Sequence, residues 1–144
     1  MTRKDAGSFA AKRSPDETLD PRVAAAIQEQ AVKKEYSCLQ AEELAVHLQI
    51  GIEKVGVALD LLEIRMVSCQ LGLFGYAPES RIVRPAASVS PDMEDAIRQA
   101  LVNGRLPCLA AWAIAERKGT SRMAVSSACE ALKIKIKPCQ LGAF

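Results

Sequence analysis

Residues 69–74 read CQLGLF, and residues 139–144 repeat the phrase almost unchanged as CQLGAF. The two phrases are offset by 70 residues, and the same offset relates Cys38 to Cys108 and Pro21 to Pro91. Residues 21–74 align with residues 91–144 without a gap, and the copies are identical at the first-copy positions Pro21, Ala26, Ile27, Val32, Cys38, Leu39, Ala41, Ala45, Val55, Ala58, Leu62, Ile64, Cys69, Gln70, Leu71, Gly72 and Phe74. Two copies are too few for a solenoid, which needs about three repeats. We therefore interpret the chain as two like domains in tandem.

The composition is that of a globular protein, with 49% hydrophobic residues, 25% charged residues and a net charge of +2. No apolar run approaches the roughly 18 residues of a membrane span. Residues 1–20 lack the apolar core of a secretion signal and mix both charges, so we predict a flexible N-terminal tail. Five cysteines, an odd number without a secretory context, indicate reduced thiols. These features predict a cytoplasmic protein with no membrane partner.

Each copy begins with a predicted helix. Asp20 and Ser90 are favourable N-cap residues, and Pro21 and Pro91 then occupy the first helical position. Apolar residues recur at helical spacing in both copies, at Val23, Ile27 and Ala31 and at Met93, Ile97 and Leu101.

Two further helices are predicted in each copy, separated by a break too short for anything but a tight turn. Their buried stripes are marked by apolar residues spaced i, i+3, i+4 and i+7. In the first copy these are Ala41, Leu44, Ala45 and Leu48, then Val55, Ala58, Leu59 and Leu62. In the second they are Ala111, Ile114 and Ala115, then Val125, Ala128, Cys129 and Leu132. Two amphipathic helices joined in this way form a helix-turn-helix unit.

Short strands are predicted around YSCL and LPCL, and again after the third helix, where Ile134 and Ile136 alternate with lysines. The CQLG phrase is expected to close the last strand and turn in each copy, with its leucine and phenylalanine filling that copy's small core.

The order helix, strand, helix, helix, strand, turn resembles the winged-helix branch of the helix-turn-helix regulators, a superfamily that includes molybdate-responsive and MarR-like proteins. The resemblance rests on Leu44, Ala45, Gly51, Val55, Ala58 and Leu62, and on Ala115, Ser121, Val125, Ala128 and Leu132. It implies an α+β, mainly α fold of two tandem winged-helix repeats, each a helix-turn-helix with a small β-hairpin.

The corresponding domains are a tail at 1–20, a repeat at 21–84, a linker at 85–90 and a repeat at 91–144. Residues 75–84 suffice for a wing with a returning strand at Arg81–Val83. The wing of the second repeat is predicted to be truncated.

The repeated cysteines Cys38, Cys69, Cys108 and Cys139 allow two interpretations. Four thiolates could bind zinc or an iron–sulfur cluster, which would make the chain a metal- or redox-sensing regulator. No Cys-x-x-Cys pair is present, and free cysteine is commonly a small buried apolar residue. We therefore expect structural thiols and no cofactor. His47, the one histidine, has no catalytic partners in the sequence, and no nucleotide-binding glycine motif occurs, so no enzymatic activity is expected.

The two copies differ in charge. Acidic residues outnumber basic ones between residues 40 and 63, whereas the balance is reversed between residues 110 and 133. Duplex phosphates would attract the second segment and repel the first. We therefore predict a DNA-binding transcriptional regulator that contacts double-stranded DNA chiefly through the second repeat. The third helix of a helix-turn-helix enters the major groove, so the predicted contacts are Thr120, Ser121, Arg122, Ser126, Ser127, Lys133 and Lys135.

The alternative function is protein–protein interaction, because winged helices also serve as docking modules. Trp112 replaces Glu42 of the first copy beside the core stripe, which suggests that a neighbour covers it. Glu53 and Lys54 lie at the start of the third helix of the first copy, where a protein partner fits better than DNA. A homodimer or another protein partner is compatible with either function.

Overall fold

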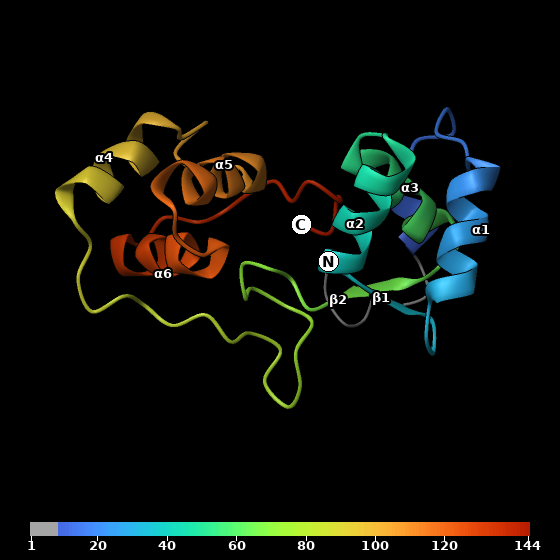
Figure 1. Ribbon diagram of the computed structural model, residues 1–144, viewed down its shortest axis with the longest axis horizontal. Coiled ribbons are helices and arrows are strands. Elements are labelled where there is room, and N and C mark those ends of the chain that lie inside the picture. Colours follow the sequence, from blue (N-terminus) through green and yellow to red (C-terminus); the bar gives the residue numbers. More distant parts are fainter. Residues whose placement is uncertain (1–8) are drawn as a thin grey trace. The chain divides into compact units, whose positions relative to one another are not determined.

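The computed structural model describes residues 9–144 and shows an α+β, mainly helical fold (Figure 1). In chain order the elements are a short 3₁₀-helix η2 (Phe9–Lys12), α1 (Pro21–Gln30), β1 (Glu35–Ser37), α2 (Cys38–Leu48), α3 (Ile52–Leu61), β2 (Arg65–Val67), α4 (Pro91–Gln99), α5 (Cys108–Lys118) and α6 (Arg122–Leu132). Asp20 and Ser90 cap α1 and α4 as the sequence predicts, and Ser121 caps α6. Each accepts a hydrogen bond from a main-chain N–H in the first turn.

The chain forms two compact units whose boundaries do not follow the order of the sequence. Unit 1 comprises the chain up to Cys69 together with Leu141–Ala143, and unit 2 comprises Gln70–Gln140 together with Phe144. Each unit therefore contains three helices of one copy and a segment that follows the last strand of the other copy. In Figure 1 the red C-terminal trace reaches the helices of unit 1, and the green trace after β2 continues into unit 2.

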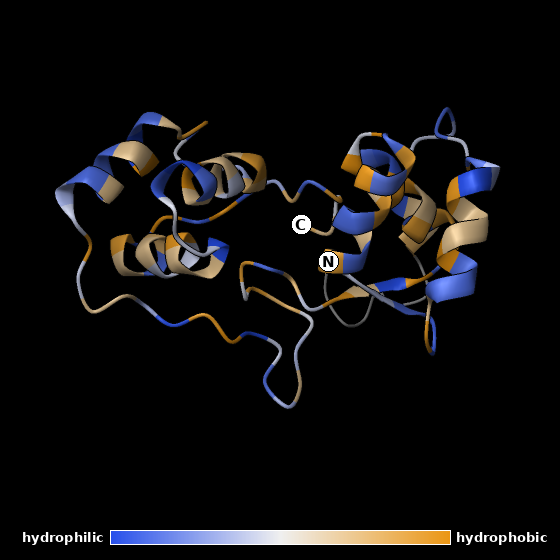
Figure 2. Cartoon of the chain, viewed as in Figure 1, coloured by the Kyte–Doolittle hydropathy of each residue, from blue (hydrophilic) through white to orange (hydrophobic). Residues whose placement is uncertain are grey.

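The three helices of each unit bury equivalent residues. In unit 1, Ile27, Ala41 and Val55 are fully buried, and in unit 2 so are Ile97, Ala111 and Val125, each 70 residues later. Apolar and polar segments alternate along these helices in Figure 2, as expected for helices that pack on one side. The core stripes predicted from the 3.6-residue period are confirmed in part. The residues that are only half-buried are Ala31, Leu48, Leu62, Met93, Leu101 and Leu132.

The strands pair in parallel and form no hairpin. Tyr36 of β1 lies opposite Met66 of β2 in the only sheet of residues 9–144. Unit 2 repeats this pairing as a single parallel bridge between Leu106 and Ile136. The expected β-hairpin is absent from residues 9–144, and residues 81–83 run as irregular chain. The reason is that the N–H groups of Ile82 and Val83 both donate to one carbonyl, that of Gly72, instead of forming a ladder.

Two further expectations need correction. Cys38 and Cys108 do not lie on strands but are the first residues of α2 and α5. Residues 9–13 are docked on unit 1 rather than forming a flexible tail: Phe9 is buried, and the N–H groups of Phe9 and Ala10 donate to the Glu63 carboxylate at 2.8 and 2.9 Å. The composition of this segment is that of a mobile chain. The buried Phe9 ring and the Glu63 carboxylate nevertheless anchor the start of η2. Residues 1–8 of the predicted tail lie outside the described residues.

Candidate interaction sites at the third helix of each unit

The third helix of each unit carries an extended segment of the other copy. We call residues 70–73 the first arm and Leu141–Ala143 the second arm. Leu71 of the first arm is fully buried in unit 2, and Leu141 of the second arm is 4% exposed in unit 1. The two leucines therefore fill equivalent places, but each fills the core of the other copy and not, as the sequence suggested, of its own.

In unit 1 the second arm lies directly on the main chain of α3. A Cβ atom built on Gly56 would lie 2.2 Å from the carbonyl oxygen of Leu141, so only glycine leaves room for this approach. The neighbouring N-terminal segment holds the same stretch of main chain. Arg13 donates from Nη2 to the Leu141 carbonyl at 3.1 Å, and Lys12 donates from Nζ to the Gly142 carbonyl at 2.7 Å.

A carboxylate on α3 orients both of these cations. Asp60 Oδ2 lies 2.6 Å from Arg13 Nε and 3.3 Å from Lys12 Nζ. Asp60 is only 7% exposed, and its burial raises the pKa of the carboxyl above its usual value, although the two cations favour the charged form. We call Lys12, Arg13, Gly56 and Asp60 arm site 1.

In unit 2 the first arm lies against the N-terminal half of α6. The Arg122 guanidinium donates from Nη1 to the side-chain oxygen of Gln70 at 2.8 Å, and the side chain of Met123 lies against Gly72. The chain that follows stays on α6, since Arg81 pairs with Glu130 and the N–H of Ala86 donates to the Ser127 carbonyl. We call Arg81, Arg122, Met123 and Glu130 arm site 2.

The two arm sites share one design. Glu130 of α6 is the equivalent of Asp60 of α3, and each pairs with an arginine from the segment that precedes the first helix of its unit. Arg13 performs this role before α1, and Arg81 performs it before α4.

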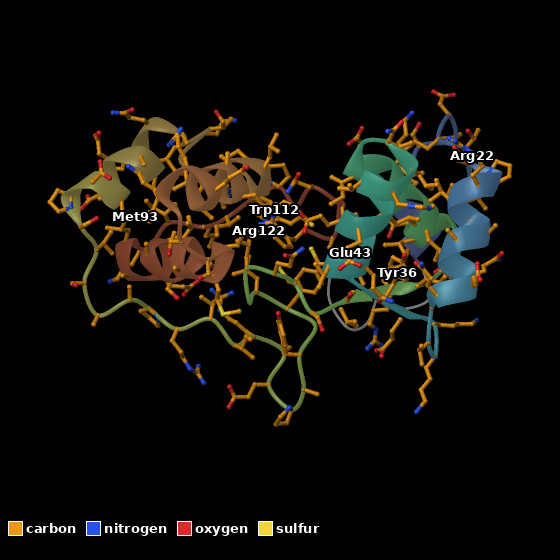
Figure 3. The ribbon with its side chains drawn as sticks, viewed as in Figure 1. Arg22, Tyr36, Glu43, Met93, Trp112 and Arg122 are labelled. Carbon is orange, nitrogen blue, oxygen red and sulfur yellow. The ribbon has the colours of Figure 1, made fainter. Side chains whose placement is uncertain are left out.

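Arg122 is also held by a second contact. Its guanidinium lies 3.7 Å from the centroid of the Trp112 ring, and Figure 3 shows the two labelled side chains together at α5 and α6. An arginine over an indole face is a cation–π pair. The Trp112 side chain, expected at an interface, is half-buried within unit 2, and its Nε1–H is buried with no hydrogen-bond partner among the described residues.

The predicted DNA contacts are therefore not brought together on one open surface. Ser126, a predicted DNA contact, is completely buried, so it is not available to a base edge. Ser127 is half-buried. Thr120, Ser121, Lys133 and Lys135 are exposed, although the Ser121 hydroxyl is also the N-cap of α6.

Most of the cysteines are buried. Cys38, Cys69, Cys108 and Cys129 are buried, and Cys139 is half-buried. Burial raises the pKa of the Cys129 thiol to about 11. No group of three or more histidine, cysteine or acidic side chains among the described residues could hold a metal ion. Likewise, none of the helices in residues 9–144 combines the length and apolar character that crossing a membrane requires.

Some apolar side chains that both copies share remain in solvent. Val32 and Val102 are 69% and 57% exposed, and Leu39 and Leu109 are 50% and 66% exposed. Packing within a unit does not explain why both copies carry the same large apolar residue at these positions. Glu53 and Lys54, the other predicted protein contacts, are exposed.

Comparisons with protein-family models, with curated proteins and with solved structures found no match to this chain.

Sequence reasoning missed Gly56, Asp60 and Arg13. One signal was present: Gly56 interrupts the interior of a predicted helix, where glycine is unfavourable unless another group approaches closely. No signal in the sequence linked Arg13 to Asp60.

Proposed function

We propose that the chain is a protein-interaction adaptor whose third helices bind extended segments of the Gln-Leu-Gly type. One observation carries this proposal: α3 and α6 each already hold such a segment, contributed by the other copy. The second arm is recognised through a buried leucine, main-chain carbonyls and a glycine at close approach, and the first through a buried leucine and the Gln70 side chain. These are the elements by which proteins recognise extended peptides, in which main-chain hydrogen bonds supply affinity and side-chain pockets supply specificity.

The contacts that α6 already makes favour protein interaction over recognition of DNA by that helix. A recognition helix reads base edges with exposed residues of its N-terminal half. On α6 this half carries the first arm, Arg122 is engaged with Trp112 and Gln70, and Ser126 is buried. The helix-strand-helix-helix-strand order of unit 1, which unit 2 repeats with a single bridge in place of the strands, remains compatible with a winged-helix ancestry, and winged helices also act as docking modules.

A peptide titration tests the adaptor. The peptide of residues 138–144, labelled with fluorescein, is titrated with the full chain carrying Leu141→Asp, which disables the tethered arm. Burying one leucine contributes about 1.5–3 kcal/mol and each hydrogen bond about 1 kcal/mol. These contributions add up to about 3.5–5 kcal/mol, so we expect saturable binding with a dissociation constant on the order of 1 mM.

Two controls are matched to this titration. A peptide with the same Leu141→Asp change should not bind, and neither should the intact peptide to a chain that carries both Leu141→Asp and Gly56→Ala. Equal binding by all combinations, or none by the intact pair while circular dichroism shows folded protein, would overturn the adaptor proposal.

Nucleic-acid binding is the second candidate, as part of a transcriptional regulator. Lys133, Lys135 and Lys137 are exposed after α6, and no ion pair within residues 9–144 neutralises them. Such a cluster suits phosphate contacts without base reading. Binding to mixed-sequence duplex DNA should then weaken steeply as salt rises, and Lys133→Glu with Lys135→Glu should abolish it. Binding that persists in this variant would exclude the cluster as the site.

A further inference from the structure

The second arm and the site that holds it come from different copies of the repeat. Leu141–Ala143 follows α6 of the second copy but belongs to unit 1, whereas residues 70–73 follow α3 of the first copy but belong to unit 2. Within one chain, the arm that follows each copy thus packs in the unit of the other copy. Two separate single-repeat chains could exchange their arms in the same way. Exchange of identical elements is a low-barrier route to a two-fold dimer, since both states use the same contacts.

Every contact that arm site 1 makes can be offered equally by another molecule. The site uses the Leu141 side chain, the carbonyls of Leu141 and Gly142, and the space above Gly56 that a Cβ would fill. The cations Lys12 and Arg13 are already oriented by Asp60. The second arm of another copy carries the same groups.

We propose that a second copy of this chain is a partner of arm site 1, and that its second arm displaces the resident one. This inference rests on the proposed function and names the partner. Two chains that exchange second arms reciprocally form a closed two-fold dimer, because each chain offers one arm and one site. The tethered arm has the advantage of a high effective concentration, so the dimer forms at high protein concentration.

The tethered arm is a short segment, so a competing arm needs only local opening to enter the site. The contacts of the tethered arm include one buried leucine and hydrogen bonds from two side chains, of which Lys12 is exposed. Such contacts permit brief local opening of a segment, in contrast to global unfolding.

A complementation experiment with two full-length variants tests the inference. The first variant carries Gly56→Ala, which blocks arm site 1 and leaves the second arm intact. The second variant carries Leu141→Asp, which disables the arm and leaves the site open. Neither variant can pair with itself through this contact, so each alone should sediment as a monomer. Mixed together, they should form a one-to-one complex whose dissociation constant lies within about tenfold of the value for the free peptide.

The controls separate this inference from the adaptor function. Combining Gly56→Ala and Leu141→Asp in the first variant should remove the complex, because neither partner then has a usable arm. If the peptide binds but the two variants stay monomeric at concentrations well above the peptide's dissociation constant, the second copy is not a partner and the adaptor function stands. If the peptide does not bind, the adaptor proposal fails first.

Folding of the variants is checked by circular dichroism. Alanine is favourable in a helix, so Gly56→Ala should keep α3 intact. If Leu141→Asp unfolds unit 1, Leu141→Ala is used in its place, because it removes most of the buried side chain without introducing a charge. A complex with either folded variant supports the inference, and its absence with both overturns it.

Discussion

Arg122 shows how the environment of a residue changes its role. At the start of α6, an arginine is a natural candidate for contact with guanine or phosphate. In the structure its guanidinium lies over the Trp112 ring and donates to Gln70, so one side chain joins α5, α6 and the first arm. Its role within the fold is to hold the first arm.

Replacing Arg122 should therefore reduce stability rather than DNA affinity. The change Arg122→Ala removes a cation–π contact and a charge-assisted hydrogen bond, and should lower the free energy of unfolding by about 1–3 kcal/mol. Urea denaturation measures this difference. Arg117→Ala, at an exposed position near the end of α5, is the matched control and should change stability by less than about 0.5 kcal/mol. Equal effects from the two substitutions would contradict the proposed role of Arg122.

The cysteines should differ in reactivity by their surroundings. The thiolate is the reactive form, and the pKa of Cys129 is raised to about 11 by burial. At pH 8 only about one Cys129 thiol in a thousand is then ionised. Half-buried Cys139 should react first with a thiol reagent in native protein, which mass spectrometry of the labelled peptides would reveal. Modification of Cys129 at a rate like that of Cys139 would mean that α6 opens readily.

At the scale of elements, the sequence specifies local structure where local chemistry is strong. Proline at the first helical position and aspartate or serine before it define the starts of α1 and α4. The turn before β1 is different. Lys33 and Lys34 both have positive φ angles, 52° and 59°, and the equivalent residues of the second copy are Asn103 and Gly104. Two successive positive φ angles define a type I′ turn, for which Asn-Gly is the preferred pair.

Introducing the second copy's turn into the first should stabilise unit 1. The double change Lys33→Asn with Lys34→Gly replaces two lysines whose φ angles are positive with residues that tolerate this conformation. It should raise the free energy of unfolding by about 1 kcal/mol. The reverse change in unit 2, Asn103→Lys with Gly104→Lys, should lower it by a similar amount. Thermal denaturation of both variants checks the pair. A stabilising reverse change would show that the turn conformation does not limit stability.

At the scale of the whole molecule, cores are completed by segments distant in sequence. Asp60 of α3, Arg13 before α1 and the second arm meet at one site although they span most of the chain. The charge on Asp60 therefore affects how these parts hold together.

Asp60 should make stability depend on pH in a defined direction. Its pKa is raised in the folded protein above the ordinary value of 3.8, chiefly by burial. An acid of this kind binds its proton more tightly in the native state. Its contribution to stability is therefore present below pH 3.8 and is lost as pH rises through the folded pKa. Asp60→Asn removes this titration, so the stability of this variant relative to the parent should increase as pH rises above 3.8. Urea denaturation at several pH values measures it, and a relative stability that falls with pH would contradict the assignment.

The sequence alone determined the duplication, the positions of the helices and their buried stripes, because caps and the 3.6-residue period act between near neighbours. The parallel pairing recurs as Tyr36 with Met66 and Leu106 with Ile136, which the common offset also implies. Only the tertiary structure decided which core each arm completes. Leu71 and Leu141 are chemically identical and follow equivalent strands, so no local preference distinguishes the core of one copy from that of the other. The choice depends on distant groups: Gly56 leaves room for the Leu141 carbonyl, Lys12 and Arg13 hold the second arm, and Arg122 holds Gln70 of the first.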